Sequence, residues 1–212
     1  MKIFLDFDDV LFNTKKFIQD EIDIFRKYGI SEEIFKKHYY QYGKNKKGKI
    51  IKKYNLKKQL QGIKKELNIN IDNIENELRI FLSIVSRYIF SDTVLFLKQF
   101  ERKELFLISY SKTEFQKLKI KNSGLANYFE KIKITNGNKE EEMLKFIGKN
   151  KKEELFFIDD RVDYILKVKK KIPQIKTILL KRKEGRYDNE KNKYCDFVAK
   201  NLKQALKIIK ND

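Results

Sequence analysis

Short apolar runs that alternate with longer amphipathic segments make up the hydrophobic pattern of the chain. Four runs of four or five residues stand out, and two weaker candidates accompany them. The strong runs are residues 3–7, 105–109, 155–158 and 177–180, and the weaker ones are residues 131–135 and 196–199. Short apolar runs separated by helices are typical of buried parallel strands in an α/β sheet.

The spacing of these runs is uneven, because no comparable run is found between Leu11 and Ser91. A gap of roughly eighty residues is too long for a structureless loop in a compact domain. Apolar residues within the gap recur at helical spacing, which predicts four helices. The helices are expected over residues 14–28, from 31 toward 43, over 50–67, and from about 71 onwards.

Together these patterns predict an α/β fold with two parts. Residues 1–13 and 92–212 should form a core domain with a Rossmann-like parallel sheet, because strands and helices alternate there. Residues 14–91 should form an α-helical domain inserted directly after the first strand.

Composition and charge narrow the functional classes. The chain has 212 residues and no apolar run long enough to span a bilayer. The early acids Asp6, Asp8 and Asp9 interrupt what could otherwise be a signal peptide, and the single cysteine, Cys195, allows no intramolecular disulfide. A cytoplasmic protein with no membrane partner is therefore expected.

The net charge of +19 would attract anions, including nucleic acids and phosphorylated metabolites. The excess is mostly lysine and is spread along the whole chain, and Ile and Asn are abundant too. This pattern favours a coding bias toward AT-rich codons. Nucleic-acid binding stays open as an alternative, since a basic footprint is only the first of several signs of it.

Polar side chains follow three of the four strong runs. The first run leads into residues 6–9 (Asp-Phe-Asp-Asp), the second into 109–111 (Ser-Tyr-Ser), and the third into Asp159 and Asp160. Ligands of open parallel sheets bind at the carboxyl ends of the strands. These polar residues are therefore the candidates for a functional site.

The acids in this set favour a magnesium site. Asp6, Asp8 and Asp160 would repel one another unless a cation lay between them, and Mg²⁺ prefers oxygen ligands. Asp6 could then attack phosphorus to form an aspartyl-phosphate, and Asp8 could act as the general acid and base. Asp159 is an equally placed candidate ligand, so the choice between Asp159 and Asp160 stays open.

The phosphoryl group itself needs hydrogen-bond donors. Ser109 and Lys139 are predicted to bind its oxygens and offset the developing charge, with Tyr110 as a further substrate-binding candidate. Lys131 and Lys133 are rivals of Lys139 for the same role. Ser109 taken alone could equally be a helix N-cap.

The order and spacing of these motifs resemble the haloacid dehalogenase (HAD) superfamily. Residues 3–11 (IFLDFDDVL) match its first motif, an apolar strand followed by Asp-x-Asp-x-[Thr/Val]-Leu. Residues 107–109 (LIS) match the second motif, Lys139 matches the third best, and residues 157–160 (FIDD) match the fourth. The resemblance covers the chain from end to end.

The resemblance implies a HAD-like hydrolase whose helical insertion is a cap of the C1 type. It also implies that Asp6, Asp8, Asp159 and Asp160 hold Mg²⁺. Members that cleave carbon–halogen bonds generally lack an acid at the position of Asp8, so Asp8 favours phosphoester hydrolysis or phosphoryl transfer. A large cap favours a small substrate, such as a nucleotide or a sugar phosphate.

Two alternatives stay open at this point. One is a mutase that passes the phosphoryl group from Asp6 to a sugar, and the other is a basic nucleic-acid-binding protein or polynucleotide end phosphatase. Residues 35–44, where aromatic and basic side chains interleave, could stack a nucleobase. Helical spacing favours core packing of Phe35, Tyr39 and Tyr42 instead.

Overall fold

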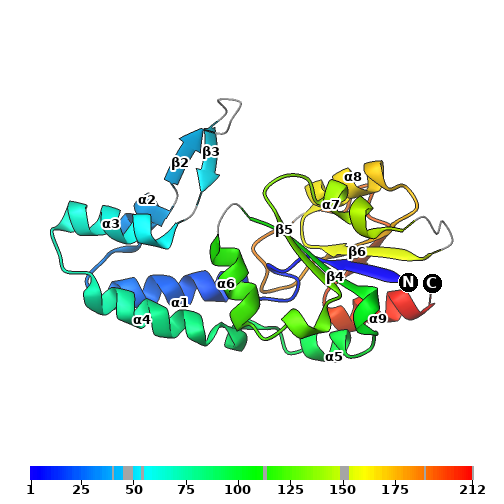
Figure 1. The fold of residues 1–212 in the computed structure, drawn as a ribbon, viewed down its shortest axis with the longest axis horizontal. Helices are drawn as coiled ribbons and strands as arrows, with labels where there is room; N and C mark the ends of the chain where they lie inside the picture. Colours follow the sequence, from blue (N-terminus) through cyan, green and yellow to red (C-terminus); the bar gives the residue numbers. More distant parts are fainter. Residues whose placement is uncertain are drawn as a thin grey trace.

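A six-stranded sheet, in which every strand pair is parallel, lies in the lobe that holds both chain termini (Figure 1). The computed structural model describes residues 1–39, 41–44, 50–53, 55–111, 114–148, 153–188 and 190–211. In spatial order the strands are β5 (Lys131–Thr135), β4 (Leu105–Tyr110), β1 (Lys2–Leu5), β6 (Leu155–Asp159), β7 (Lys176–Leu180) and β8 (Phe197–Ala199). All six expected strands are present, with their ends shifted by no more than two residues.

The central strands are buried on both faces, which explains why they are continuous apolar runs. In β1, Ile3 and Leu5 belong to one apolar cluster, whereas Phe4 belongs to a second cluster on the opposite face. Helices α7 (Lys139–Phe146) and α8 (Val162–Lys171) cover the Phe4 face. The opposite face is covered by α5 (Thr93–Leu97), α6 (Glu114–Asn122) and α9 (Leu202–Asn211). This arrangement confirms the α/β, Rossmann-like fold class.

Four helices inserted after β1 make up most of a second lobe (Figure 1). They are α1 (Thr14–Lys27), α2 (Glu32–Tyr39), α3 (Leu56–Leu67) and α4 (Asp72–Ser83). Short 3₁₀ helices lie at η1 (Val85–Tyr88), η2 (Arg102–Glu104) and η3 (Ala126–Tyr128). Helix α6 of the sheet lobe lies between the two lobes, where it packs against α4 and η1.

The expectation of a purely helical insertion is wrong in one place. An antiparallel ribbon joins α2 to α3, with strands β2 (Gln41–Lys44) and β3 (Ile50–Lys53). Helix α3 therefore begins at Leu56, where the Asn55 side chain accepts a hydrogen bond from the Lys58 amide (3.0 Å). Pairing with β2 satisfies the backbone of the β-branched pair Ile50–Ile51 in β3, and the Asn55 cap sets the later helix start.

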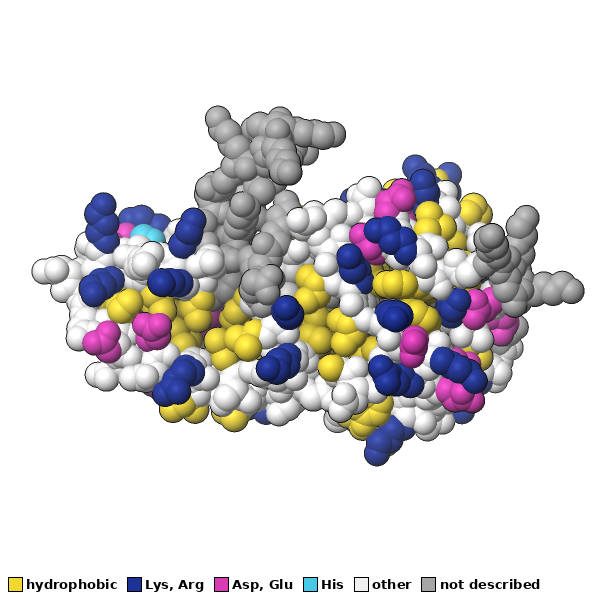
Figure 2. All heavy atoms as spheres, in the orientation of Figure 1, with side chains coloured by type: hydrophobic (Ala, Val, Ile, Leu, Met, Phe, Trp, Pro, Cys, Tyr) yellow, Lys and Arg dark blue, Asp and Glu magenta, His cyan; other side chains and the backbone are white. Residues whose placement is uncertain are grey.

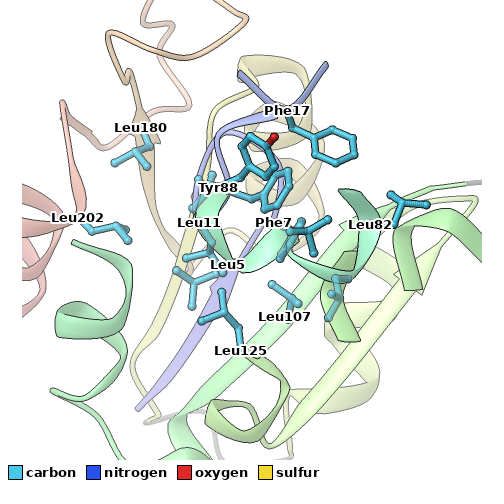
Figure 3. Close-up of a cluster of buried hydrophobic side chains, with 14 of the residues drawn as sticks. Leu5, Phe7, Leu11, Phe17, Leu82, Tyr88, Leu107, Leu125, Leu180 and Leu202 are labelled. Atoms are coloured by element: carbon cyan, nitrogen blue, oxygen red, sulfur yellow. The ribbon is translucent and has the colours of Figure 1, made fainter. Parts of the chain in front are cut away.

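One apolar cluster runs from the sheet into the insertion. Phe7 stacks on Phe12 with ring centroids 5.0 Å apart, and Phe12 lies 5.7 Å from Tyr88. The rings of Tyr88 and Phe17 are nearly perpendicular, with centroids 5.3 Å apart. Figure 3 shows Phe7, Phe17 and Tyr88 close together above Leu107 of β4. The two chain connections between the lobes also run side by side, since the Asn13 amide donates to the Tyr88 carbonyl (2.8 Å). The expected boundary near residues 13 and 92 stays a prediction.

The expected helical packing of residues 35–44 is confirmed for Phe35 and Tyr39 on α2 and is wrong for Tyr42, which lies in strand β2. Phe35 is buried against Phe25 and Tyr39, with ring centroids 5.0 and 5.2 Å away. Tyr40 lies outside the described residues, as does the side chain of Tyr42. The described part of this segment therefore contributes aromatic rings to the interior of the insertion.

Lysine and arginine side chains are scattered over the face shown in Figure 2, with Asp and Glu among them. On this face they do not gather in one basic patch, which agrees with the spread of lysines along the sequence. Among the helices of the described residues, none has the length and apolar character needed to cross a bilayer.

Candidate active site

The site lies where the three middle strands end. Strand β1 lies between β4 and β6, so Asp6 after β1 is placed between Ser109 of β4 and Asp159 of β6. The Asp6 amide donates to the Ile158 carbonyl (3.0 Å), which ties the start of the turn to β6. The parallel order of the strands thus gathers residues that are far apart in the sequence.

A tight turn follows Asp6 and contains the other two acids of the first motif, Asp8 and Asp9. Asp9 has a left-handed backbone (φ 56°), and its amide donates to the Phe12 carbonyl (2.8 Å). Its side chain is fully buried and accepts a hydrogen bond from Arg186 Nε. The sequence suggested no role for Asp9, yet it holds the loop after β7 against this turn.

Lys139 joins two of the acids. Its ammonium nitrogen lies 2.8 Å from Asp6 Oδ1 and 2.7 Å from Asp159 Oδ2, and its side chain is fully buried. The rival Lys133 lies 3.4 Å from Glu142, and Lys131 is exposed on the edge strand β5. Of the three lysines, Lys139 is the one that reaches the acids.

Asp6, Asp159 and Asp160 form the group of acids that could share one metal ion, within the part of the chain that the structure describes. Each offers a carboxylate oxygen, and these oxygens all lie within 4.8 Å of one another. Burial, together with the neighbouring carboxylates, raises the pKa of Asp6 and of Asp160 above the ordinary range, although Lys139 opposes this rise. The three acids therefore fit a hard cation such as Mg²⁺, which would relieve their repulsion.

Asp8 points to a different set of partners. Thr14 Oγ1 donates to Asp8 Oδ1 (2.6 Å), Gln116 Nε2 donates to Oδ2 (2.9 Å), and Lys119 Nζ also donates to Oδ1. Burial alone would raise the pKa of Asp8, but Lys119 and then Arg186 hold it well below its usual range. The side chain is thus an ionised carboxylate, and it is not among the three acids that could share an ion. Its expected role as a metal ligand stays a prediction.

The phosphate-binding candidates take up two positions beside the acids. Ser109 is buried at the end of β4, where Gln116 Nε2 donates to its Oγ (2.9 Å). Tyr110 is half-buried, and its ring lies 5.9 Å from that of Tyr164, which also faces Lys139 at 4.4 Å. Ser109 and Asp6 therefore lie at the ends of neighbouring strands, and Lys139 lies beside Asp6.

Four residues of the site were missed at the level of the sequence, namely Thr14, Gln116, Lys119 and Arg186. Gln116 and Lys119 are three positions apart in α6, so they share one face of that helix and reach Asp8 together. A polar pair at this spacing on the helix after the second motif was the available signal. Arg186 lies in a polar loop, and no local pattern connected it to Asp9.

Comparisons with known proteins point to one kind of fold. No protein-family model matches the chain, and no curated protein is similar in sequence. Among solved structures, the HAD-hydrolase YfnB from Bacillus subtilis, bound to magnesium, matches with a TM-score of 0.63 and 13% identity over 98% of this chain and 97% of its own. A haloacid dehalogenase-like hydrolase from Burkholderia xenovorans LB400 matches with a TM-score of 0.65 and 13% identity over 97% and 94%.

L-2-haloacid dehalogenases are similar to the chain as well. The enzyme from Xanthobacter autotrophicus matches with a TM-score of 0.59 and 11% identity, over 99% of this chain and 98% of its own. At such low identities the likeness establishes the fold and leaves the reaction open. From strand order, motif placement and these matches together, the chain has the fold of the HAD-like hydrolases.

Proposed function

We propose that the chain is a Mg²⁺-dependent phosphatase that hydrolyses a small phosphomonoester through an aspartyl-phosphate on Asp6. One observation carries the proposal: Asp6, Asp159 and Asp160 converge in a buried cluster beside Lys139, and a second acid, Asp8, lies two residues further on. The cluster suits a metal and a phosphoryl group, and Asp8 suits proton transfer.

Asp6, Asp159 and Asp160 are the residues that would hold Mg²⁺. The bound cation would neutralise part of the negative charge of the carboxylates and of an incoming phosphoryl group. Asp159 is held in place by Lys139 and by the Arg161 amide, which donates to Asp159 Oδ1 (2.8 Å). This support fixes the carboxylate that faces Asp6.

The proposed reaction has two steps. A carboxylate oxygen of Asp6 attacks phosphorus, the ester P–O bond breaks, and the leaving oxygen takes a proton from Asp8. Water then attacks phosphorus and gives a proton to Asp8, which releases inorganic phosphate and the Asp6 carboxylate. Ser109 and Lys139 donate hydrogen bonds to the phosphoryl oxygens in both steps.

The hydrogen-bond partners of Asp8 determine its protonation state before each step of the proposed reaction. As an ionised carboxylate, Asp8 is ready to accept a proton from water, as the second step requires. The first step requires a protonated Asp8. We therefore propose that Asp8 turns away from Lys119 when the substrate binds and takes up a proton from the solvent or from a singly protonated phosphate ester.

Carbon–halogen cleavage is the main competing reaction, because L-2-haloacid dehalogenases have similar structures. A halide ion leaves without a proton, so that reaction has no use for an acid at Asp8. The mutase and the polynucleotide end phosphatase use the same Asp6 chemistry and differ only in the acceptor or the substrate. The face shown in Figure 2 carries scattered lysines and no single basic patch, so this face gives no support to a polynucleotide substrate.

The helical insertion is proposed to act as a cap that selects the leaving group and excludes water. Its connections to the sheet lobe run close to Asp8, since Thr14 at the start of α1 donates to that carboxylate. A cytoplasmic location and a phosphorylated metabolite as the substrate also stay predictions.

Hydrolysis of p-nitrophenyl phosphate in the presence of Mg²⁺ tests the proposal. The wild-type protein should release phosphate only with a divalent cation, and Asp6→Asn should abolish the release. Asp163→Asn, a change of a half-buried acid that pairs with Arg161, is the matched control and should keep activity. Undiminished activity in Asp6→Asn, or chloride release from 2-chloropropionate in its place, would rule out the proposed reaction.

A further inference from the structure

The side chain of Gln116 joins two residues of the proposed mechanism. Its Nε2 lies 2.9 Å from Ser109 Oγ and 2.9 Å from Asp8 Oδ2. The residue is almost fully buried on the face of α6 that looks toward the end of the sheet. Gln116 is therefore placed to influence the phosphate-binding hydroxyl directly.

Lys119, together with the Asp8 carboxylate that accepts from Nε2, determines which way the Gln116 amide points. Lys119 Nζ lies 3.3 Å from Gln116 Oε1, and an ammonium group can only donate hydrogen bonds. The Gln116 oxygen must therefore face Lys119, which turns the NH₂ group toward Ser109. Lys119 is itself held among the rings of Phe12, Phe17 and Phe7, whose centroids lie 4.7, 5.4 and 5.5 Å from Nζ.

This orientation decides what the Ser109 hydroxyl can do. Because Gln116 Nε2 donates to Ser109 Oγ, the serine oxygen acts as the acceptor in that contact. Among the described residues, Ser109 O–H has no acceptor of its own, although the side chain is buried. A buried hydroxyl hydrogen without an acceptor is costly, so it points to a ligand oxygen that is absent from the protein itself.

We propose that Gln116 is a positioning residue that turns the Ser109 hydroxyl to donate to a phosphoryl oxygen, and that Lys119 holds the Gln116 amide in that orientation. The inference rests on the proposed phosphatase function, because it takes the ligand oxygen to belong to a phosphoryl group. Asp6 lies at the end of the neighbouring strand, so the donated hydrogen bond would meet the phosphoryl group beside the nucleophile. The substrate thereby gains one directed donor that does not come from the cap.

Binding of inorganic phosphate to the Mg²⁺-loaded protein, measured by calorimetry, is the first arm of the test. Gln116→Met removes the donor at nearly constant volume, and Gln116→Glu replaces it with an acceptor that would capture the Ser109 hydrogen. Each should weaken phosphate binding about 10-fold to 100-fold, the range expected for one hydrogen bond to a charged group. Lys121→Met, an exposed change on the same helix, is the matched control and should leave the Kd unchanged.

A double-mutant cycle separates positioning from mere packing. In a Ser109→Ala background the Gln116 variants should weaken phosphate binding no further, because the hydroxyl that they orient is gone. The single variants should also raise the KM for p-nitrophenyl phosphate in step with the phosphate Kd. Two Gln116 variants are used in case one of them folds poorly, which a lower melting temperature would reveal. The other variant then still tests the inference.

Independent effects of Ser109 and Gln116 in the cycle, or a wild-type Kd in both Gln116 variants, would overturn the inference. A wild-type protein that binds no phosphate would overturn it too. A wild-type protein that binds phosphate with the expected Gln116 dependence but releases none from esters would instead contradict the proposed phosphatase function alone.

Discussion

Asp6 and Asp8 are two residues apart in the chain, yet they lie in opposite electrostatic surroundings. Asp6 faces Asp159 and Asp160, and its pKa is raised by burial despite Lys139. Asp8 faces Lys119 and Thr14, and its pKa is lowered. Two carboxyl groups whose pKa values are driven apart are a common basis for different roles in one reaction. One turn of the chain thus separates the proposed metal and nucleophile side from the proposed proton-transfer side.

Replacement of the second carboxylate is the strongest test of this division. Asp8→Asn should lower kcat for an alkyl phosphomonoester by about 10²-fold to 10⁴-fold, the usual contribution of a general acid and base. The loss should be smaller for p-nitrophenyl phosphate, whose leaving group needs no proton. Steady-state kinetics with both substrates measure the contrast. Equal losses on the two substrates would remove proton donation from the role of Asp8.

Replacement of Lys139, whose ammonium group lies between Asp6 and Asp159, tests the electrostatic surroundings of Asp6. Lys139→Met leaves Asp6 and Asp159 buried without their ammonium partner, and should destabilise the metal-free protein by about 3 kcal/mol. Lys145→Met, an exposed lysine on the same helix, should change the free energy of unfolding by less than about 0.5 kcal/mol. Urea denaturation in EDTA compares the two variants. Similar stabilities for both would contradict a structural role of the buried lysine.

The raised pKa values predict how stability depends on pH without metal. Because folded Asp6 and Asp160 bind protons more tightly than the unfolded chain does, stability should fall as pH rises from about 5 to 8. Each proton that the folded protein holds and the unfolded chain has lost lowers the free energy of unfolding by about 1.4 kcal/mol per pH unit. Saturating Mg²⁺ should reverse this trend, because the cation replaces the protons. Melting temperatures that rise with pH in EDTA would contradict the prediction.

The smallest effect on stability is expected for Asp9, in the turn that follows Asp6. Asp9→Asn keeps a residue that tolerates the left-handed backbone but loses the charge that pairs with Arg186. Because Arg186 is partly exposed, the loss of stability should be about 1 kcal/mol. Calorimetric unfolding provides the measurement. A loss as large as that of Lys139→Met would contradict this ranking and would show that the Asp9–Arg186 pair stabilises the fold as much as Lys139 does.

The strands and the acids could be predicted because their signals are local. A buried parallel strand is a short apolar run, and the residue that follows it lies at the edge of the sheet where ligands bind. The ribbon of β2 and β3 was missed because its residues also fit the helical spacing around them. Pairing between residues 41–44 and 50–53 is an interaction that a helical pattern within one segment does not reveal.

Thr14 is a near neighbour of Asp8 in the chain, but the other two partners could not be predicted, because they come from distant parts of the chain. Gln116 and Lys119 are 108 and 111 residues from Asp8, and they reach it only because β4 pairs with β1. Arg186 is 177 residues from Asp9 and approaches it from the loop after β7. Among so many lysines and arginines, no sequence pattern singles out the few that become buried.

The sequence alone determined the strands, the acids at their ends and the choice of Asp6 as the candidate nucleophile, since each depends on neighbouring residues. Only the tertiary structure decided which cation stands beside which acid. That choice depends on strand order and on burial, which place Lys139 with Asp6 and Lys119 with Asp8. The electrostatic difference between the two acids arises from contacts across the sheet, and a one-dimensional pattern does not contain those contacts.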